Sequence, residues 1–256
     1  MLALITGASS GIGREMAYYL ASLQYDLILV ARDKVAMEKI KKDVNVAVKI
    51  IVLDLIKEEN VFQLYEMVKK ETIDVLINNA GFGLFGLFHK TDLDRELEMI
   101  DLNIKAYHIL TKLFLQDFLT KDRGYILNVC SSAGFMAGPR LSTYYATKNY
   151  VTKLTMAINE ELRLMKSKVY IGALCPGPVK TNFNKVAKGE FSIKEANAKY
   201  VACYGIDKMF KRKMLIIPKL SMKLSVFLTR FVPYRLQLFI SYHVQWRKEN
   251  GCKKQN

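Results

Sequence analysis

The stretch STYYATKNY, residues 142–150, contains two adjacent tyrosines followed one helical turn later by a lysine. Residues four apart share one face of a helix, so Tyr144 and Lys148 would project together, with Tyr145 only slightly off that face. Two serines lie upstream, Ser131 thirteen residues before Tyr144 and Ser132 thirteen residues before Tyr145. A phenol whose pKa is lowered by a nearby ammonium group can exchange a proton with a substrate. Helix geometry and the spacing to serine leave open which tyrosine does so.

A glycine-rich turn, TGASSGIG, occupies residues 6–13, directly after the first apolar run of the chain. Gly7 permits a tight turn, Gly11 lets the backbone approach a pyrophosphate, and Gly13 lets the following helix pack against the strand. The N-terminus of that helix offers N–H groups and a positive dipole end to phosphate. A loop without a ligand can need the same glycines, but a strand before and a helix after favour dinucleotide binding. The contacts expected here are Gly7, Ser9, Ser10, Gly11, Ile12 and Gly13.

The type of dinucleotide depends on the end of the second predicted strand, in LILVARDK. An acidic side chain there would bind a ribose 2′-hydroxyl, whereas a basic one would pair with a 2′-phosphate. The strand is followed by Ala31 and Arg32, and a guanidinium fork suits phosphate geometry. We therefore expect NADP(H), with the hydroxyls of Ser9 and Ser10 close by. The alternative is that Arg32 is only a solvated charge at the start of a helix, and the neighbouring Asp33 weakens the argument.

Two further strands end in residues that fit a cofactor site. Asp54 follows the third strand and could accept a hydrogen bond from an adenine amino group, although an acidic helix cap would look the same. The fourth strand ends in LINNAG, where Asn78, Ala80 and Gly81 offer an amide and a closely approaching backbone, but these residues could also form only a turn. Their position at the carboxyl ends of strands favours the site. The contacts expected here are Asp54, Leu55, Asn79, Ala80 and Gly81.

The elements that must position these residues follow a βαβ pattern. Short apolar runs alternate with longer amphipathic segments, which predicts a parallel sheet with helices on both faces and a ligand crevice at the carboxyl ends of the strands. We expect a doubly wound α/β Rossmann fold of about seven strands in the order 3-2-1-4-5-6-7. The strands are expected at about 2–6, 26–31, 48–53, 73–77, 124–130, 168–174 and 213–217. A chain of 256 residues, 51% of them hydrophobic, fits one catalytic domain over residues 1–217 and a basic amphipathic helical extension over residues 218–256.

The cysteines and the first residues indicate a compartment. Cys130, Cys175, Cys203 and Cys252 show no close pairing in the sequence, and the opening MLALITGASSG lacks the basic and apolar segments of a secretory signal. Disulfides persist mainly in oxidising compartments. We therefore expect a reducing, cytoplasmic location, with neither a disulfide framework nor a metal site.

The net charge of +15 is concentrated at the end of the chain, where residues 205–256 hold 12 basic and 2 acidic residues, or +10 of the total. In the segment KLSMKLSVFLTRFV, Lys219, Lys223 and Arg230 fall on one stripe of a predicted helix, with apolar residues around most of the rest. No uncharged run approaches the roughly 18–20 residues that span a bilayer. We expect the extension to cap the substrate pocket, pack on a neighbouring subunit or lie on an anionic membrane surface. Nucleic acid is excluded as a partner, because the basic residues belong to an apolar helix rather than to a groove with interleaved aromatics.

Taken together, TGASSGIG, NNAG, an upstream serine and Tyr-x-x-x-Lys closely resemble the motifs of the short-chain dehydrogenase/reductase family, in the family's order and over nearly the whole chain. The resemblance implies that Tyr144 is the catalytic tyrosine, because only Tyr144 has a lysine four residues later. It also implies Ser131 as the catalytic serine and Asn103, in MIDLNIKAY, as the member that completes a tetrad with Lys148. The stretch CPGPVKTNF is similar to the family segment that meets the nicotinamide carboxamide. The cofactor contacts implied in this way are Tyr144, Lys148, Pro176, Gly177, Val179 and Thr181.

The chemistry that the resemblance implies is NADP(H)-dependent hydride transfer between the nicotinamide and a carbonyl or secondary alcohol. Lys148 would lower the pKa of Tyr144, Ser131 would hydrogen-bond the substrate oxygen, and Tyr144 would protonate that oxygen. Asn103 would hold a water that links Lys148 to solvent. Tyr145 would pack against its neighbours or form part of the pocket wall.

Several candidate wall residues of the substrate pocket are apolar, which favours a bulky hydrophobic ketone or alcohol over a sugar or a charged metabolite. They are Phe82, Leu84, Phe85, Phe135, Met136 and Phe183, and any one of them could equally belong to the core. The sequence as a whole is similar to the family branch of hydroxysteroid and long-chain ketoacyl reductases, and we expect a homo-oligomer, either a dimer or a tetramer. The alternative function is a cofactor-binding sensor or scaffold without turnover, which would have no physical need for all four tetrad residues.

Overall fold

The protein is built on a seven-stranded parallel sheet in the order β3-β2-β1-β4-β5-β6-β7, which confirms the predicted Rossmann fold and its strand order. The computed structural model describes residues 1–181, 183, 187 and 195–252, and of residues 230 and 247–252 it describes the backbone alone. The strands are β1 (Leu2–Thr6), β2 (Asp26–Ala31), β3 (Val48–Val52), β4 (Val75–Asn78), β5 (Tyr125–Val129), β6 (Tyr170–Leu174) and β7 (Leu215–Ile216).

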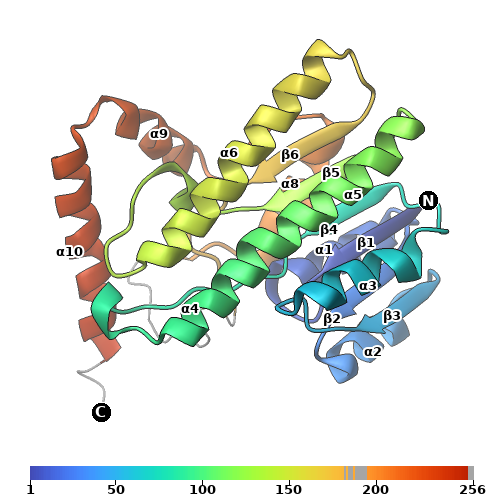
Figure 1. Ribbon diagram of the computed structural model, residues 1–256, viewed down its shortest axis with the longest axis horizontal. Helices are drawn as coiled ribbons and strands as arrows, with labels where there is room; N and C mark the ends of the chain where they lie inside the picture. The colour runs from blue at the N-terminus through green and yellow to red at the C-terminus, as the bar shows by residue number, and fades with distance from the viewer. Residues whose placement is uncertain (182, 184–186, 188–194, 253–256) are drawn as a thin grey trace.

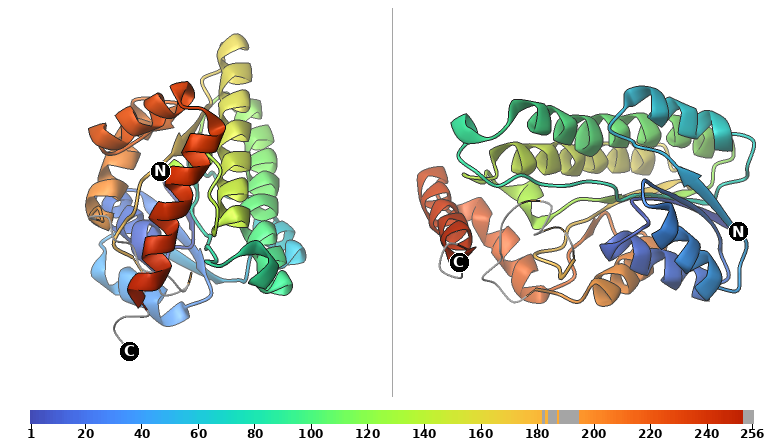
Figure 2. Two further views of the ribbon diagram at one scale, coloured as in Figure 1. Left: turned by 90° about the vertical axis from the view of Figure 1, so that its left-hand side faces the viewer. Right: turned by 90° about the horizontal axis from the view of Figure 1, so that it is seen from below.

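Helices cover both faces of the sheet, so that the described part of the chain has three layers, which Figure 2 shows edge-on in its right-hand view. One face carries α1 (Gly11–Ser22), α2 (Lys34–Asp43) and α8 (Ala198–Phe210). The other carries α3 (Glu58–Val68), α4 (Leu93–Ile100), α5 (Tyr107–Thr120) and α6 (Ser142–Leu164). Short turns of helix lie between them at η1 (Phe88–Lys90), η2 (Asp101–Ala106) and η3 (Ser132–Phe135).

The strands are apolar on both sides because each side is covered by helices. In β1, Ala3 and Ile5 belong to the buried cluster under α1 and α8, whereas Leu4 between them belongs to the cluster under α3 and α5. This alternation is the two-residue period of a strand. It explains why the strands appear in the sequence as nearly continuous apolar runs.

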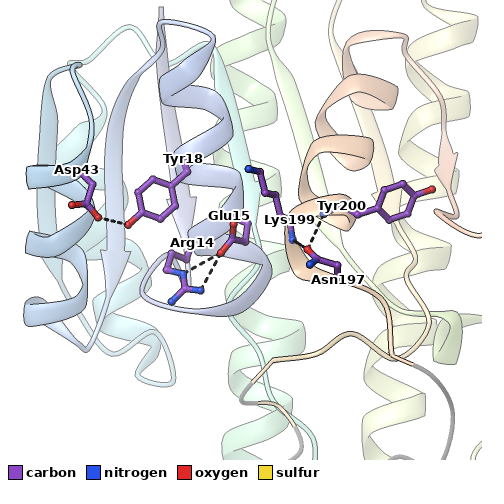
Figure 3. A network of polar contacts seen from close by, with 7 residues as sticks. All are labelled: Arg14, Glu15, Tyr18, Asp43, Asn197, Lys199 and Tyr200. Carbon is purple, nitrogen blue, oxygen red and sulfur yellow. Dashed lines mark hydrogen bonds and ion pairs between the residues drawn. The ribbon is translucent and has the colours of Figure 1, made fainter.

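Helix α1 is bonded to α2 through Tyr18, which Figure 3 shows, and to α8 through the Tyr19 hydroxyl, which donates to the Asp207 carboxylate at 2.6 Å. The Tyr18 hydroxyl donates to the Asp43 carboxylate at the end of α2 over 2.8 Å. Across α1, the Asn197 side chain caps α8 by accepting from the N–H groups of Lys199 and Tyr200 at 2.8 and 3.3 Å. The N-terminus of α1, which follows the glycine-rich turn, is therefore held in place on two sides.

After β7 the chain forms α9 (Leu220–Leu228), η4 (Thr229–Phe231) and α10 (Tyr234–Cys252) at the end of the molecule to which the strands point (Figures 1 and 2). The predicted helical extension is confirmed, with α9 in the segment predicted between Pro218 and Pro233. Helix α10 begins after Pro233, whose carbonyl accepts from the N–H groups of Leu236 and Gln237. Across the residues that the structure covers, none of the helices combines the length and hydropathy that crossing a bilayer requires. That residues 218–256 form a unit separate from residues 1–217 stays a prediction.

Some strands are shorter than predicted at their amino ends. The fourth, expected from residue 73, begins at Val75. The N–H of Ile73 bonds instead to the Glu71 carbonyl in a turn, and the Asp74 carboxylate accepts from the N–H of Leu2. Local hydrogen bonds thus take up these residues before sheet pairing begins.

A buried polar network lies on the helix side of β4 and β5. The Asn78 amide donates to the Asn128 side chain at 2.9 Å and to the Thr111 hydroxyl at 3.1 Å, and the Asn128 amide donates to the Thr155 hydroxyl at 2.9 Å. The prediction that the Asn78 amide lies beside a cofactor is therefore wrong. Asn78 is still within the strand and faces α5, whereas Asn79 lies past the strand's end.

Replacing Asn128 with alanine is expected to lower the free energy of unfolding by about 1–3 kcal/mol, because the buried amide of Asn78 loses an acceptor. Urea unfolding followed by circular dichroism measures the change. The matched control is Asn45→Ala at an exposed position, expected to alter stability by less than about 0.5 kcal/mol. Equal effects in the two variants would contradict the structural role of the network.

Candidate active site

The carboxyl ends of the strands open into a cavity of about 720 Å³. Every cofactor contact predicted from the sequence lines this cavity except Gly13, and so do Ser131, Tyr144 and Lys148. Asn103 does not line it. Gly13 and Asn103 lie behind the cavity wall, where they contact Asn79 and Phe82, which do line the cavity.

The glycine-rich turn is tied to the end of β4. Gly7 has a φ of +63°, and a Cβ there would lie 2.8 Å from the Cα of Ala80. The Asn79 amide donates to the carbonyls of Thr6 and Gly7, each at 3.0 Å. The Thr6 hydroxyl accepts from the N–H groups of Asn79 and Ala80 at 2.9 and 3.2 Å. A Cβ at Gly13 would lie 2.4 Å from the Asn79 amide nitrogen, so Gly13 has a packing role.

The residues around the first turn of α1 fit a pyrophosphate. The N-cap residue Ser10 makes no side-chain capping bond, and the first turn holds no acidic residue, so its N–H groups are available to an anion. Gly11 has a φ of +55°, and a Cβ there would lie 3.1 Å from the Thr181 side chain. The glycine therefore keeps the gap between the turn and Thr181 open.

Arg32 lies at the cavity with its guanidinium 3.5 Å from the carboxylate of Asp54, and its side chain is 66% exposed. The two residues predicted to meet the 2′-phosphate and the adenine thus form an exposed ion pair, which holds the arginine weakly. The Asp33 carboxylate caps α2 by accepting from the Ala36 N–H at 3.0 Å. One oxygen of Asp33 is thereby used by the helix, while the residue also lines the cavity beside Arg32.

Tyr144 and Ser131 face the cavity from α6 and from the end of β5. Enclosure of the Tyr144 phenol raises its pKa above the usual value, and the nearby Ser131 hydroxyl acts in the opposite direction. The Ser131 oxygen accepts from the Ala133 N–H at 3.1 Å, which leaves the hydroxyl hydrogen free to donate. Tyr144 is consequently protonated at neutral pH.

Lys148 is buried, and its ammonium group donates to the Val129 carbonyl at 3.0 Å. The nitrogen lies 5.1 Å from the centroid of the Tyr107 ring and 6.0 Å from that of Tyr144. Burial lowers the pKa of Lys148. Desolvation of the phenol is the largest influence on the pKa of Tyr144 in this arrangement, and the lowering of that pKa by Lys148 stays a prediction.

Asn103 lies in η2, a π-helical turn between α4 and α5 of a kind often found at functional sites. Its side-chain oxygen accepts from the Phe82 N–H at 3.1 Å, and its amide donates to the Phe82 carbonyl at 2.9 Å and the Thr147 hydroxyl at 3.1 Å. A Cβ at Gly81 would lie 2.7 Å from the Asn103 side-chain oxygen. The side chain therefore anchors the loop after β4 to α6, and the water that Asn103 was expected to hold stays a prediction.

The wall residues predicted from the sequence divide into two groups. Those that line the cavity are Phe82, Met136 and Phe183. Those that do not are Leu84, Phe85 and Phe135. Phe85 and Phe135 pack in small buried clusters instead. Arg95, which the sequence analysis missed, also lines the cavity and stacks over the Phe82 ring with 3.9 Å between its Cζ and the ring centroid.

Further walls come from the last two helices, which no sequence motif had marked. They include Met222 and Val226 from α9 and Ile240, Ser241 and Gln245 from α10. The Gln245 amide donates to the Tyr145 hydroxyl at 2.7 Å, and burial raises the pKa of Tyr145 to about 12. The adjacent tyrosines therefore differ in their partners, since Tyr144 faces Ser131 and Tyr145 is held by the end of the chain.

Two cysteines that are distant in sequence meet behind Lys148. Cys130 and Cys175 follow the neighbouring strands β5 and β6, and both are buried free thiols in one small cluster. The sequence spacing could not reveal this contact, because sheet order creates it. Within the described residues, no three His, Cys, Asp or Glu side chains are placed to hold a metal ion.

Comparison with known proteins agrees with this geometry. A family model for short chain dehydrogenases matches residues 1–190. The NADP-dependent 3-hydroxy acid dehydrogenase of Schizosaccharomyces pombe is 36% identical over 192 residues, which cover 72% of this chain and 73% of the relative. The structure of a short-chain dehydrogenase from Sphingobium yanoikuyae in complex with NADPH is 29% identical, with a TM-score of 0.80 over 86% of this chain and 88% of the other. The bulky-bulky ketone specific alcohol dehydrogenase from Comamonas testosteroni is 26% identical, with a TM-score of 0.77 over 90% and 92%.

The fold, the glycine-rich turn and the site together define a nicotinamide-dependent oxidoreductase. The chain belongs to the short-chain dehydrogenase/reductase family, as its motifs indicate. Its cofactor is a nicotinamide dinucleotide.

Replacing Lys148 with methionine is expected to raise the free energy of unfolding at pH 7 by about 1 kcal/mol, because it removes a buried charge. The Val129 carbonyl, which accepts from Lys148, keeps a hydrogen bond in the variant, since the Tyr107 hydroxyl also donates to it at 3.2 Å. Burial lowers the pKa of Lys148 in the folded state, so the unfolded chain binds more protons between the folded and unfolded pKa values. The wild type therefore gains stability as pH rises through the folded pKa, and the advantage of the variant should shrink toward pH 10.

Urea unfolding at pH 7 and pH 9.5 tests this. The matched control is Lys153→Met, at an exposed position on the same helix, and it should show neither the gain nor the pH dependence. A Lys148→Met variant that is less stable than the wild type at both pH values would contradict the account of the buried ammonium group.

Proposed function

We propose that the protein is an NADP(H)-dependent carbonyl reductase or alcohol dehydrogenase, which transfers hydride reversibly between the nicotinamide and a carbonyl or secondary alcohol of a bulky hydrophobic molecule. The observation that carries the proposal is the convergence of Ser131, Tyr144 and the buried Lys148 on one cavity. The same cavity is bounded by a glycine-rich turn that fits a pyrophosphate. No observation favours the alternative of a sensor or scaffold without turnover.

The proposed reaction divides between the cofactor and the protein. When bound, the nicotinamide supplies hydride to the carbonyl carbon. The Ser131 hydroxyl donates a hydrogen bond to the carbonyl oxygen, and Tyr144 donates its phenolic proton to the same oxygen, so that an alcohol forms. The lowered pKa of Lys148 makes its ammonium group a better acid, which helps to return a proton to Tyr144. A water held by Asn103 would complete the path to solvent.

The proposed substrate class rests on the cavity walls. Phe82, Met136, Phe183, Val226 and Ile240 give one part of the cavity an apolar lining, which suits a hydrophobic ketone. One relative is named for a 3-hydroxy acid and another for bulky ketones. A hydroxy acid carries an alcohol and a ketone carries a carbonyl, which are the two groups that the proposed reaction interconverts. The family resemblance is also the basis for expecting a dimer or tetramer.

The direct test of the function is turnover with purified protein. NADPH consumption should be seen by its absorbance with a panel of bulky hydrophobic ketones, and NADP⁺ reduction with the corresponding alcohols. Absence of turnover with every ketone and alcohol, together with tight NADPH binding, would favour the sensor or scaffold.

Replacing Tyr144 with phenylalanine should abolish turnover, by about 10²-fold or more, while NADPH binding is retained, because only the transferable proton is removed. The matched variant Tyr145→Phe should be much milder, since its hydroxyl is engaged with Gln245. Steady-state kinetics and cofactor titration on both variants measure the contrast. The opposite ranking would assign the proton transfer to Tyr145.

The protein should bind NADPH at least about tenfold more tightly than NADH, because an arginine fork can pair with the 2′-phosphate. Arg32→Ala should remove most of that preference by weakening NADPH binding alone. Fluorescence titration with both cofactors measures it, with Arg163→Ala at the far end of α6 as the control. Equal dissociation constants of the wild type for NADPH and NADH would rule the preference out.

A further inference from the structure

The inner side of α10 is polar. Gln237, Ser241 and Gln245 follow one another at helical spacing and line the cavity; Ser241 is 8% exposed and Gln245 is 2% exposed. The Gln237 amide donates to the carbonyls of Thr229 and Val232 at 2.7 and 2.6 Å, and Gln245 is bonded to Tyr145. These contacts fix which side of the helix faces the protein.

The outer side of α9 and α10 is apolar, and we call it the lid face. It comprises Leu224, Phe227, Phe231, Leu236, Phe239 and Trp246, whose side chains are 46–71% exposed. A surface helix of a globular protein normally buries its apolar residues and exposes its polar ones. Helix α10 departs from this pattern, because Gln237, Ser241 and Gln245 face the cavity beside Ile240 and Val244, whereas Leu236, Phe239 and Trp246 are exposed.

The lid face belongs to two helices at the same end of the molecule. Figure 2 shows α9 and α10 next to each other at one end of the molecule, and in its left-hand view no other element lies in front of α10. A single exposed leucine is ordinary, but an apolar surface that extends over two helices marks an interaction site.

The charge near the lid face distinguishes between two partners, a second copy of the chain and a lipid surface. Lys223 and Arg235 are exposed on the same two helices, and the sequence from residue 219 to residue 246 contains no aspartate or glutamate. A second copy of the chain seated on the same face would bring cations against cations, whereas an anionic lipid surface would complement them.

The aromatic residues support the same partner. Tyr234, Tyr242 and Trp246 are exposed on α10, and such rings, apolar with one polar end, are favoured at the boundary between lipid and water. Helices with an apolar side and flanking basic residues lie in that boundary without crossing it.

We propose that the lid face docks on an anionic lipid bilayer, with the apolar side chains of α9 and α10 entering the headgroup region. The inner sides of the same helices line the cavity, so docking brings the cavity against the bilayer. The proposal does not depend on the reaction catalysed.

The chain offers an internal probe, because Trp246 is its only tryptophan. Full-length protein is mixed with vesicles of phosphatidylglycerol and phosphatidylcholine, and with vesicles of phosphatidylcholine alone. Sedimentation with the anionic vesicles should be stronger by at least about tenfold and should fall at high salt. Trp246 emission should shift to the blue and be quenched by brominated lipid.

Variants then locate the contact. Leu224→Glu combined with Phe239→Glu should weaken anionic-vesicle binding by at least about tenfold, because both side chains enter the headgroup region. The matched control is Val35→Glu combined with Phe62→Glu, which places the same two charges at exposed apolar positions on α2 and α3 and should leave binding unchanged. NADPH binding reports whether each variant is folded. If a variant does not fold, the quenching of wild-type Trp246 by brominated lipid still tests whether the lid face contacts the bilayer.

Three results would overturn the proposal. One is the absence of any association of the full-length protein with anionic vesicles at low salt. Another is vesicle binding without quenching of Trp246 by brominated lipid, which would place the contact elsewhere. The third is a stable dimer that shields Trp246 from an aqueous quencher and is broken by the double variant, which would assign the lid face to a second copy of the chain.

Discussion

The burial of the Lys148 ammonium group is the constraint on which the arrangement of the site depends. A charged nitrogen cut off from water requires an acceptor, and the Val129 carbonyl at the end of β5 provides one at 3.0 Å. Helix α6 must therefore lie directly across the end of that strand. Gly134 permits the approach, since a Cβ there would lie 2.8 Å from the Lys148 carbonyl oxygen. Because Tyr144 is one turn earlier on α6, the same contact aims its phenol at Ser131.

Part of the cavity wall is encoded apart from the tetrad and the glycine-rich turn. The family model ends at residue 190, and all the motifs of the tetrad and the glycine-rich turn lie before that point. The walls contributed by α9 and α10 lie after it. A change in the last two helices can therefore alter what enters the cavity while the relation of Tyr144 to Lys148 is kept.

The sequence predicted the sheet and its order because buried parallel strands and helix periods leave strong patterns. Tyr144 could be separated from Tyr145 only through the resemblance to the short-chain dehydrogenase/reductase family, whose motif has a lysine four residues after the tyrosine. Asn78 and Asn79 could not be told apart, since which of the two lies past the strand depends on where pairing stops. The sign of the pKa shift of Tyr144 depends on how fully the phenol is enclosed, which no spacing encodes. The contact of Gln245 with Tyr145 could not be predicted from the sequence either, because it forms only when α10 folds back over the cavity.

The central claim is that hydride and proton meet the same carbonyl group in the cavity beside Tyr144. The most direct measurement is the reduction of a bulky hydrophobic ketone with NADPH that carries deuterium at the reactive position of the nicotinamide, followed by mass spectrometry of the product. The account predicts an alcohol with one deuterium on the carbinol carbon and a proton from solvent on the oxygen. NADPH binding without any deuterated alcohol, across a panel of such ketones, would contradict it.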